Sequence, residues 1–205
     1  QYSNIELYKH QKKLFHITKT KKPFCVAYQA PTGTGKTLSP IGLSKRYKII
    51  FVCVAKHIGL QLAKACISME IPIAMALGCN DVGDIRLHYF AAKEIVKNRR
   101  SGGIFRVDNS VGDKVDIIIS DIQSYLYAMR YMQAFNKKED ILWYWDEPTI
   151  TLDYENHTFH KILKNNWEKN EIPNIILSSA TLPDKEKIMP MIYSYQKRFV
   201  DGEIH

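Results

Sequence analysis

Short runs of apolar residues alternate along the chain with longer segments in which apolar residues recur every three or four positions. Most of the short runs are continuous stretches of Val, Ile and Phe rather than in–out alternations. Such strands are typically buried on both faces, as in a parallel sheet covered by helices. The pattern predicts strands over Phe24–Gln29, Ile49–Val54, Ile73–Leu77, Val115–Ser120, Ile141–Asp146 and Ile175–Ser178.

The longer segments between these runs have the period of amphipathic helices. Helices are expected over Ile5–Thr18, Gly35–Arg46, Gly59–Met69, Leu87–Asn98, Ile122–Phe135, His157–Trp167 and Lys185–Tyr195. Repeated alternation of strand and helix predicts an α/β fold, with a mainly parallel sheet flanked by helices on both faces.

Two segments fall outside this pattern. Asn98–Gly103 joins two arginines to a pair of glycines, and we interpret it as a surface excursion between two strands, either solvated or in contact with nucleic acid. The tail Val200–His205 has no packing partner that the sequence reveals, so it is interpreted as the start of a linker or a cut end.

A phosphate-binding loop is predicted directly after the first strand, where the sequence reads Ala30-Pro31-Thr32-Gly33-Thr34-Gly35-Lys36-Thr37. The glycines let backbone N–H groups turn toward phosphate oxygens, and the following helix adds its positive N-terminal end. Lys36 can neutralise phosphate charge and the Thr37 hydroxyl can ligate Mg²⁺. The alternative interpretation is a glycine-rich turn before a helix, but the placement between strand and helix favours phosphate binding.

An acidic pair ends the strand Ile141–Asp146, which continues into Glu147, Pro148 and Thr149. In phosphate-loop enzymes an acid at the end of a neighbouring strand holds Mg²⁺, the role predicted for Asp146. Glu147 is placed to orient and deprotonate an attacking water. A solvated acidic turn is the alternative. Trp143 and Trp145 lie within the strand and are expected to fill the core.

The composition bears on the partner of the protein and on two classes of structure, membrane spans and zinc sites. The 205 residues carry a formal net charge of +8, which favours a polyanionic partner such as nucleic acid. No apolar stretch approaches the length of about 18 residues that a membrane span needs. The four cysteines are widely spaced, which favours buried thiols in a reducing, intracellular compartment over a zinc site. The abundance of Lys, Ile, Asn and Tyr suggests an AT-rich genome, such as that of a large DNA virus, a parasite or many bacteria.

A third element, Ser179-Ala180-Thr181, follows the last predicted strand. Taken in order with the phosphate loop and the acidic pair, it closely resembles the first RecA-like domain of superfamily 2 helicases, the DEAD/DEAH-like ATPases. The resemblance implies ATP and Mg²⁺ as cofactors. It implies that Lys36 and Thr37 bind phosphate and Mg²⁺, that Asp146 binds Mg²⁺ and that Glu147 is the catalytic base.

The same resemblance assigns further roles. Ser179, Ala180 and Thr181 would couple the nucleotide site to nucleic-acid binding through hydrogen bonds to the acidic motif. Gln11 stands where the family places an adenine-reading glutamine, and the alternative is a polar residue of an amphipathic helix. An amide can bond both N6 and N7 of adenine, which suits that role.

Contacts to the nucleic-acid backbone are implied after two other strands, with departures from the family pattern. Ala55-Lys56-His57 replaces the usual Pro-Thr-Arg, and Ser120-Asp121 replaces Thr-Pro. Lys56, His57 and Ser120 are the implied contacts. Asp121 would repel a phosphate, and it is expected instead to cap the helix that starts at Ile122.

The resemblance implies a RecA-like domain over residues 1–199, with residues 200–205 beginning a linker to a second RecA-like domain. Family members bind ATP between two such domains, and the second supplies arginines through a Gln/His-x-x-Gly-Arg-x-x-Arg motif that this sequence lacks. Because an arginine finger contributes about 10³–10⁵ in rate, the fragment alone is expected to be poorly active.

The leading hypothesis is an ATP-dependent helicase or translocase that hydrolyses ATP to move on or unwind DNA or RNA. The alternative is a helicase-like scaffold that binds nucleic acid under ATP control without unwinding it. A phosphate-loop enzyme of another kind, such as a small-molecule kinase, is disfavoured by the Ser-Ala-Thr element. The sequence leaves the choice between DNA and RNA open.

Overall fold

The structure is a computed structural model that describes residues 7–31, 35–148, 158–181 and 185–205. Its main sheet has the strand order β10-β1-β9-β8-β2-β7-β3-β4. Neighbours pair in parallel except β3 and β4, which are antiparallel. The strands are β1 (Phe24–Gln29), β2 (Lys48–Cys53), β3 (Ile73–Ala76), β4 (Arg86–Leu87), β7 (Ile117–Asp121), β8 (Ile141–Asp146), β9 (Asn174–Ser179) and β10 (Glu203–Ile204).

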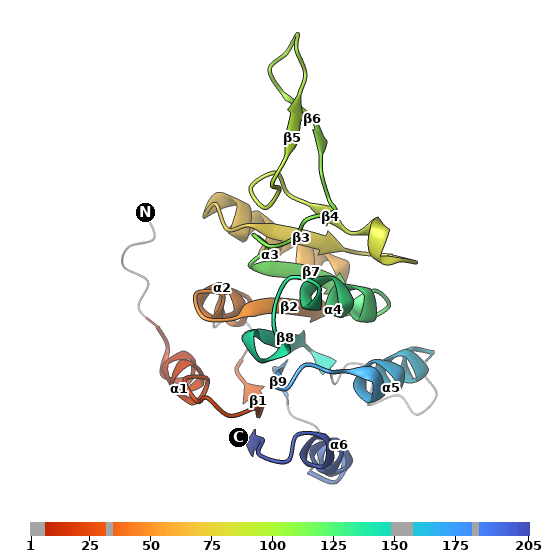
Figure 1. The fold of residues 1–205 in the computed structure, drawn as a ribbon. Helices are drawn as coiled ribbons and strands as arrows, with labels where there is room; N and C mark the ends of the chain where they lie inside the picture. The colour runs from red at the N-terminus through yellow and green to blue at the C-terminus, as the bar shows by residue number, and fades with distance from the viewer. Residues whose placement is uncertain (1–6, 32–34, 149–157, 182–184) are drawn as a thin grey trace.

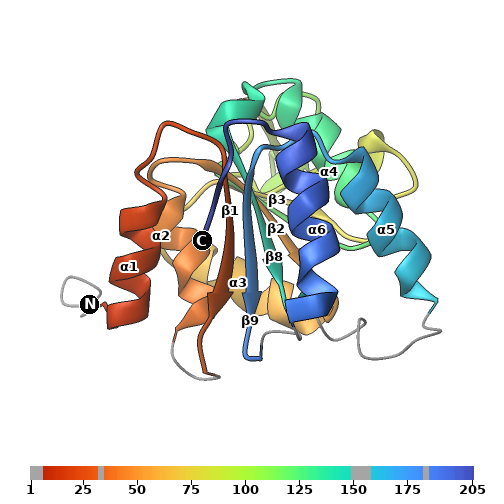
Figure 2. The same cartoon turned by 90° about the horizontal axis from the view of Figure 1, so that it is seen from below.

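Helices cover both faces of this sheet, which confirms the predicted α/β architecture (Figure 2). One face carries α1 (Lys9–Ile17), α2 (Ser39–Leu43) and α3 (Lys56–Ser68), and the other carries α4 (Tyr125–Gln133), α5 (Phe159–Lys169) and α6 (Lys185–Arg198). Short 3₁₀ helices lie at η1 (Lys36–Leu38), η2 (Val82–Asp84) and η3 (Lys138–Asp140). No helix among the described residues is long and apolar enough to cross a bilayer.

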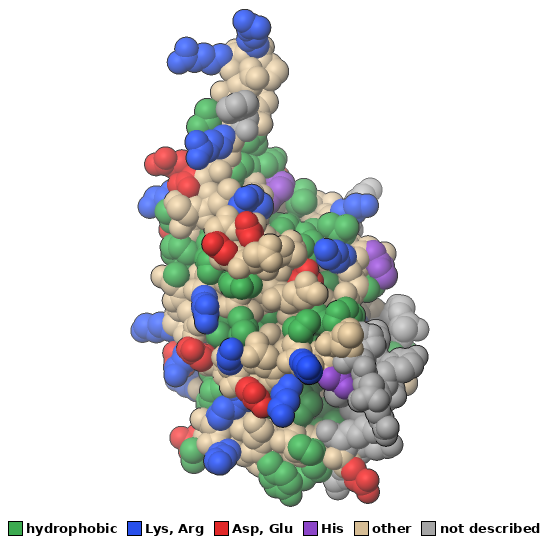
Figure 3. Space-filling view, turned by 90° about the vertical axis from the view of Figure 1, so that its right-hand side faces the viewer, with side chains coloured by type: hydrophobic (Ala, Val, Ile, Leu, Met, Phe, Trp, Pro, Cys, Tyr) green, Lys and Arg blue, Asp and Glu red, His purple; other side chains and the backbone are tan. Residues whose placement is uncertain are grey.

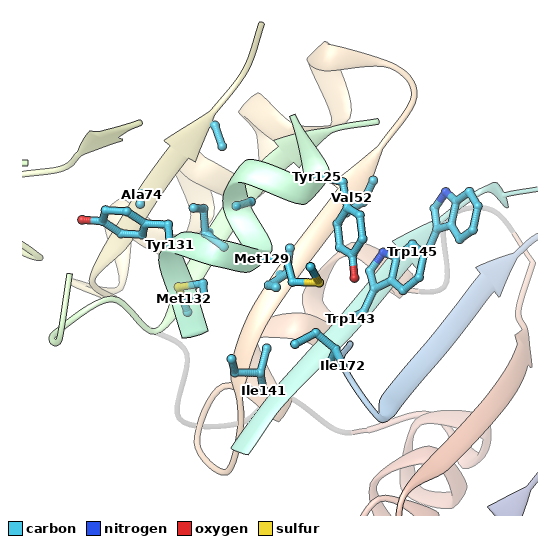
Figure 4. Packing of buried hydrophobic residues seen from close by; sticks show 14 of the residues in the cluster. Val52, Ala74, Tyr125, Met129, Tyr131, Met132, Ile141, Trp143, Trp145 and Ile172 are labelled. Carbon is cyan, nitrogen blue, oxygen red and sulfur yellow. The ribbon is translucent and has the colours of Figure 1, made fainter. Parts of the chain in front are cut away.

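Alternate residues of each central strand enter opposite halves of the core. On β8, Leu142 and Tyr144 pack beneath α1–α3, whereas Trp143 and Trp145 pack beneath α4–α6. The Trp143 ring stacks on Tyr125 of α4 with centroids 4.2 Å apart and on Trp145 at 5.0 Å (Figure 4). The prediction that both tryptophans fill the core is therefore confirmed.

The helix predicted over Leu87–Asn98 is wrong. The chain instead forms β4, a turn, and a separate two-stranded ribbon of β5 (Ile95–Lys97) and β6 (Ile104–Val107). The Leu87 N–H donates to Asn109 Oδ1, and turn bonds run from Ala91 N to His88 O and from Ala92 N to Tyr89 O. Leu87, Ala91 and Ala92 are thus buried without forming a helix, because a turn brings them to the core. The β-branched residues Ile95 and Val96 then enter the extended ribbon.

Two other segments differ from expectation. The helix predicted over Gly35–Arg46 is divided into η1 and α2, where Pro40 lies in the first turn of α2 and offers no N–H to a helix continuing from η1. The expectation that the tail has no packing partner is wrong, because β10 pairs with β1 in parallel. The Ala27 N–H donates to the His205 carbonyl, so the tail satisfies backbone groups that an edge strand would expose. Whether a linker begins there stays a prediction.

Candidate nucleotide site

Three motifs that are distant in sequence end on three adjacent strands. The phosphate loop follows β1, Ser-Ala-Thr begins at the last residue of β9 and the acidic pair begins at the last residue of β8. These strands are neighbours in the order β1-β9-β8. Parallel strands place their carboxyl ends at one edge of the sheet, where open α/β sheets bind ligands. The topology therefore brings the motifs together at one edge.

Side-chain contacts join the three motifs directly. Lys36 Nζ donates to Glu147 Oε1 at 2.7 Å, and the two side chains are 10 % and 24 % exposed. The Ala180 N–H donates to the same carboxylate oxygen at 3.0 Å. The Ser179 hydroxyl donates to Glu147 Oε2 at 2.9 Å and lies 2.6 Å from the Thr181 carbonyl oxygen. Glu147 is thus the meeting point of the phosphate-loop lysine and the Ser-Ala-Thr segment.

The backbone at Glu147 is held in an unusual conformation. Its φ of 50° is in the left-handed region, which an L side chain adopts at a cost. The Glu147 N–H donates to the Ser178 carbonyl at 2.7 Å, which fixes the turn at the ends of β8 and β9. The turn aims the carboxylate back toward the phosphate loop.

Gly35 closes the described part of the phosphate loop with a φ of 74°, just before η1. A Cβ at this position would lie 3.1 Å from Gln11 Nε2, so both the backbone angle and the space favour glycine. Gln11 Nε2 donates to the Gly35 carbonyl at 3.2 Å, and its Oε1 accepts from the Tyr8 N–H at 3.0 Å. Gln11 is buried, and in this structure its amide binds the phosphate loop itself.

Asp146 lies at the end of β8 beside this network. Burial raises the pKa of its carboxyl to about 6, and the negative charge of Glu147 adds to the rise while Lys36 opposes it. On the same strand, the Tyr144 hydroxyl donates to the Lys36 carbonyl at 3.2 Å. No sequence motif marks Tyr144, although its position two residues before Asp146 places both side chains on one face of the strand.

The remaining predicted residues of the loop are only partly placed. Thr32, Gly33 and Thr34 lie outside the described residues, and Thr37 is placed only through its backbone in η1. Pro31 is exposed at the start of the loop.

Comparison of the sequence with protein-family models and with curated proteins gives no match. Solved structures do match. A hypothetical ATP-dependent RNA helicase from Sulfolobus tokodaii superposes with a TM-score of 0.58 at 15 % identity, over 99 % of this chain and 54 % of that one. The Pyrococcus furiosus Hef helicase domain gives 0.51 at 18 % identity, over 96 % and 37 %. S. cerevisiae Dbp5, bound to Nup159, Gle1, IP6 and ADP, gives 0.50 at 13 % identity, over 98 % and 52 %.

This chain has the fold of a RecA-like helicase domain. It spans about half the length, or less, of these three structures. The mainly parallel sheet flanked by helices was expected from the sequence, and the likeness to helicase domains bears that expectation out.

The carboxyl edge of the RecA-like domain continues beyond these three motifs over β2, β7 and β3. Lys56 and His57 are exposed at the start of α3, where the helix N-terminus adds positive potential. Lys56 Nζ lies 3.9 Å from the point where a Cβ on Gly78 would stand, so α3 and the loop after β3 meet here. This places a cation on an open part of the edge.

The Ser120 side chain is not on that surface. It is fully buried and its hydroxyl donates to the Asp121 carbonyl at 2.8 Å, so the structure gives no support to a nucleic-acid contact by this hydroxyl, and the contact stays a prediction. Asp121 is also buried. Its Oδ2 accepts from the Gly78 N–H at 2.7 Å and its Oδ1 from the Ser124 N–H at 2.8 Å. It therefore holds the loop after β3 and the turn before α4, which begins at Tyr125 rather than at Ile122.

Replacing Asp121 with Ala should destabilise the RecA-like domain by about 1–3 kcal/mol, because the buried Ser124 N–H and the part-buried Gly78 N–H lose a charged acceptor. Urea unfolding measures the change. Asp113→Ala, which removes an exposed carboxylate, is the matched control and should alter stability by less than about 0.5 kcal/mol. Equal unfolding midpoints for the two variants would show that Asp121 is not a structural anchor.

Proposed function

We propose that this chain is the ATP-binding half of an ATP-dependent nucleic-acid helicase or translocase. The observation that carries the proposal is the network in which Glu147 receives hydrogen bonds from Lys36, Ser179 and the Ala180 backbone. It links a phosphate-binding lysine, an acid suited to activate water and a segment that can report on the bound nucleotide.

The residues present suit a magnesium nucleotide. Magnesium prefers oxygen ligands, and Asp146 offers a carboxylate at the end of the strand beside the phosphate loop. Thr37 is the second protein ligand that we propose. When bound, the ion would neutralise charge on the phosphates and fix their geometry.

The contacts also suggest how the chain's own groups respond to nucleotide. Lys36 is paired with Glu147 at 2.7 Å. A phosphate oxygen competes for the same ammonium group, which frees Glu147 Oε1 from its ionic partner. Ser179 continues to hold Oε2, so the carboxylate stays oriented while it becomes available to accept a proton from water.

Nucleic acid would bind along the other half of the carboxyl edge, with Lys56 and His57 as backbone contacts. Their exposure and the net charge of +8 support this placement. The nucleotide half and the nucleic-acid half share one sheet edge, so movements of the Ser-Ala-Thr segment can reach both. A second RecA-like domain would complete the ATP site.

Binding of a fluorescent ATP analogue with Mg²⁺ tests the proposal. Lys36→Ala should weaken binding by about tenfold or more, the value of a lost charge-assisted hydrogen bond. Lys48→Ala is the matched control, because Lys48 also pairs with a carboxylate, Asp116, at 2.9 Å but lies at the start of β2. Equal affinity of the wild type and Lys36→Ala would contradict the assignment.

The same titration is repeated with single-stranded DNA and with single-stranded RNA. A lower dissociation constant for the nucleotide in the presence of one of them would identify the substrate class. No effect of either would contradict coupling between the two halves of the edge.

A further inference from the structure

The antiparallel ribbon of β5 and β6 projects beyond β4, at the edge of the sheet farthest from β10 (Figure 1). Ile95 pairs with Val107, Val96 with Arg106 and Lys97 with Ile104. A register shift between Val96 and Lys97 twists the ribbon. The ribbon forms a sheet of its own, separate from the main one.

The ribbon is strongly basic. Residues 93–106 include five basic side chains and one acidic side chain, Glu94, which gives a net charge of +4 compared with +8 for all 205 residues. The basic residues are Lys93, Lys97, Arg99, Arg100 and Arg106. All five are exposed, and none forms an ion pair with another described residue. Half of the formal charge is thus concentrated on one projection.

The tip of the ribbon is ordered by its own hydrogen bonds. Asn98 Oδ1 accepts from the Arg100 N–H at 2.8 Å and from the Ser101 N–H at 3.3 Å. The Asn98 N–H donates to the Gly103 carbonyl at 2.7 Å, which closes the turn. Lys and Arg side chains gather at the far end of the projection (Figure 3). These hydrogen bonds hold the backbone of the turn in place, and the side chains of Arg99 and Arg100 stay exposed to solvent.

Apolar side chains on the ribbon are also open. Ile95, Val96 and Ile104 are 38 %, 53 % and 40 % exposed. An isolated two-stranded hairpin is only marginally stable in water. Exposed apolar area beside exposed cations fits a nucleic-acid duplex, whose phosphates supply negative charge and whose major groove offers thymine methyl groups for apolar contact.

From this we infer that the β5–β6 ribbon is a duplex-binding arm, whose tip arginines contact the phosphate backbone on either side of a groove. The major groove of B-DNA admits a two-stranded ribbon, and guanidinium groups pair with phosphates through two parallel hydrogen bonds. The sheet order leads from β2 and Lys56 over β7 and β3 to β4 and the ribbon, so the arm lies beyond the proposed nucleic-acid half and away from the nucleotide motifs. The inference rests on the proposed function for its nucleic-acid partner.

Fluorescence anisotropy with labelled duplex DNA and duplex RNA of about 20 base pairs tests the arm. Arg99→Gln combined with Arg100→Gln should weaken duplex binding about tenfold and lower the slope of log K against log salt by about 2. Lys137→Gln combined with Lys138→Gln removes the same charge from exposed positions just before β8 and should leave both quantities nearly unchanged. Comparison of the two duplexes identifies the preferred one.

A single strand of the same sequence and the fluorescent ATP analogue separate this inference from the proposed function. The arm predicts that the arginine pair affects duplex binding more than single-strand binding and leaves nucleotide affinity unchanged. Equal duplex affinity and salt slope for both double variants would overturn the arm while leaving the proposed function intact. Duplex binding that depends on the arginines in a chain that fails to bind nucleotide would support the arm and contradict the ATPase assignment. A wild-type chain that binds no nucleic acid would overturn the arm.

Discussion

Asp146→Asn should make the magnesium-free protein more stable at neutral pH, by an amount on the order of 2 kcal/mol. Burial and the adjacent Glu147 raise the pKa of Asp146 from 3.8 to about 6. The folded protein therefore holds a proton that the unfolded chain releases, and ionising this carboxyl at neutral pH costs stability. An amide of the same shape removes that cost.

The upward shift of the Asp146 pKa predicts a distinctive dependence of stability on pH. Because the folded state binds more protons between pH 3.8 and about 6, the wild type should lose stability as pH rises through this window and level off above it. In Asp146→Asn, the free energy of unfolding should no longer fall with pH through this window on account of residue 146. Urea unfolding at a series of pH values in EDTA measures both curves. Asp140→Asn, at an exposed position, is the control for loss of one carboxylate. Parallel profiles for wild type and Asp146→Asn would contradict the assignment.

Trp143→Ala should destabilise the protein by about 3–5 kcal/mol, the cost of emptying a large core site. The Trp143 side chain is fully buried, and its ring stacks on Tyr125 and Trp145, with Trp167 of α5 at 5.9 Å. The residue thus joins β8 to the two helices that cover it. Since β8 ends at Asp146 and leads into Glu147, the loss of packing should also disturb the candidate nucleotide site.

Chemical denaturation followed by circular dichroism measures this effect. Tyr193→Ala is the control, because this aromatic side chain is 64 % exposed and its removal should cost less than about 0.5 kcal/mol. If Trp143→Ala is too unstable to purify, Trp143→Phe provides a milder truncation that should give a smaller loss of the same sign. A loss below about 1 kcal/mol for Trp143→Ala would show that the site collapses around the cavity.

The central strands could be predicted because buried parallel strands leave a plain signal of continuous Val, Ile and Phe. The helix predicted over Leu87–Asn98 was wrong because the apolar spacing of this segment matches a helix, whereas the backbone turns at His88 and enters the ribbon at Ile95. The tail was misjudged because two residues of edge strand carry almost no periodic pattern. Its pairing depends on the open edge of β1, which only the assembled sheet reveals.

Motif spacing identified the residues of the candidate site but not their contacts. Lys36 and Glu147 are separated by 111 positions, and their pairing follows from the strand order, not from any local pattern. Asp121 was expected near a helix start, and it does bond the turn before α4. Its second hydrogen bond, from the Gly78 N–H in the loop after β3, could not be predicted without knowing that β3 and β7 are neighbours in the sheet. Ser120 was placed on the surface by analogy, whereas strand alternation in a two-faced core buries it.

The position of β9 has a consequence for how the protein is made. This strand leaves the ribosome after β1 and β8, yet it lies between them in the sheet and contributes Ser179 and Ala180 to the network around Glu147. Strand β1 can therefore pair with β9 only after the chain has grown by about 150 further residues. Contacts of such long range slow folding, because the chain loses its freedom before those contacts stabilise it. A nascent chain that ends before residue 174 would hold both the phosphate loop and the acidic pair without a bridge between them, so we expect the candidate nucleotide site to form only after β9 has been synthesised.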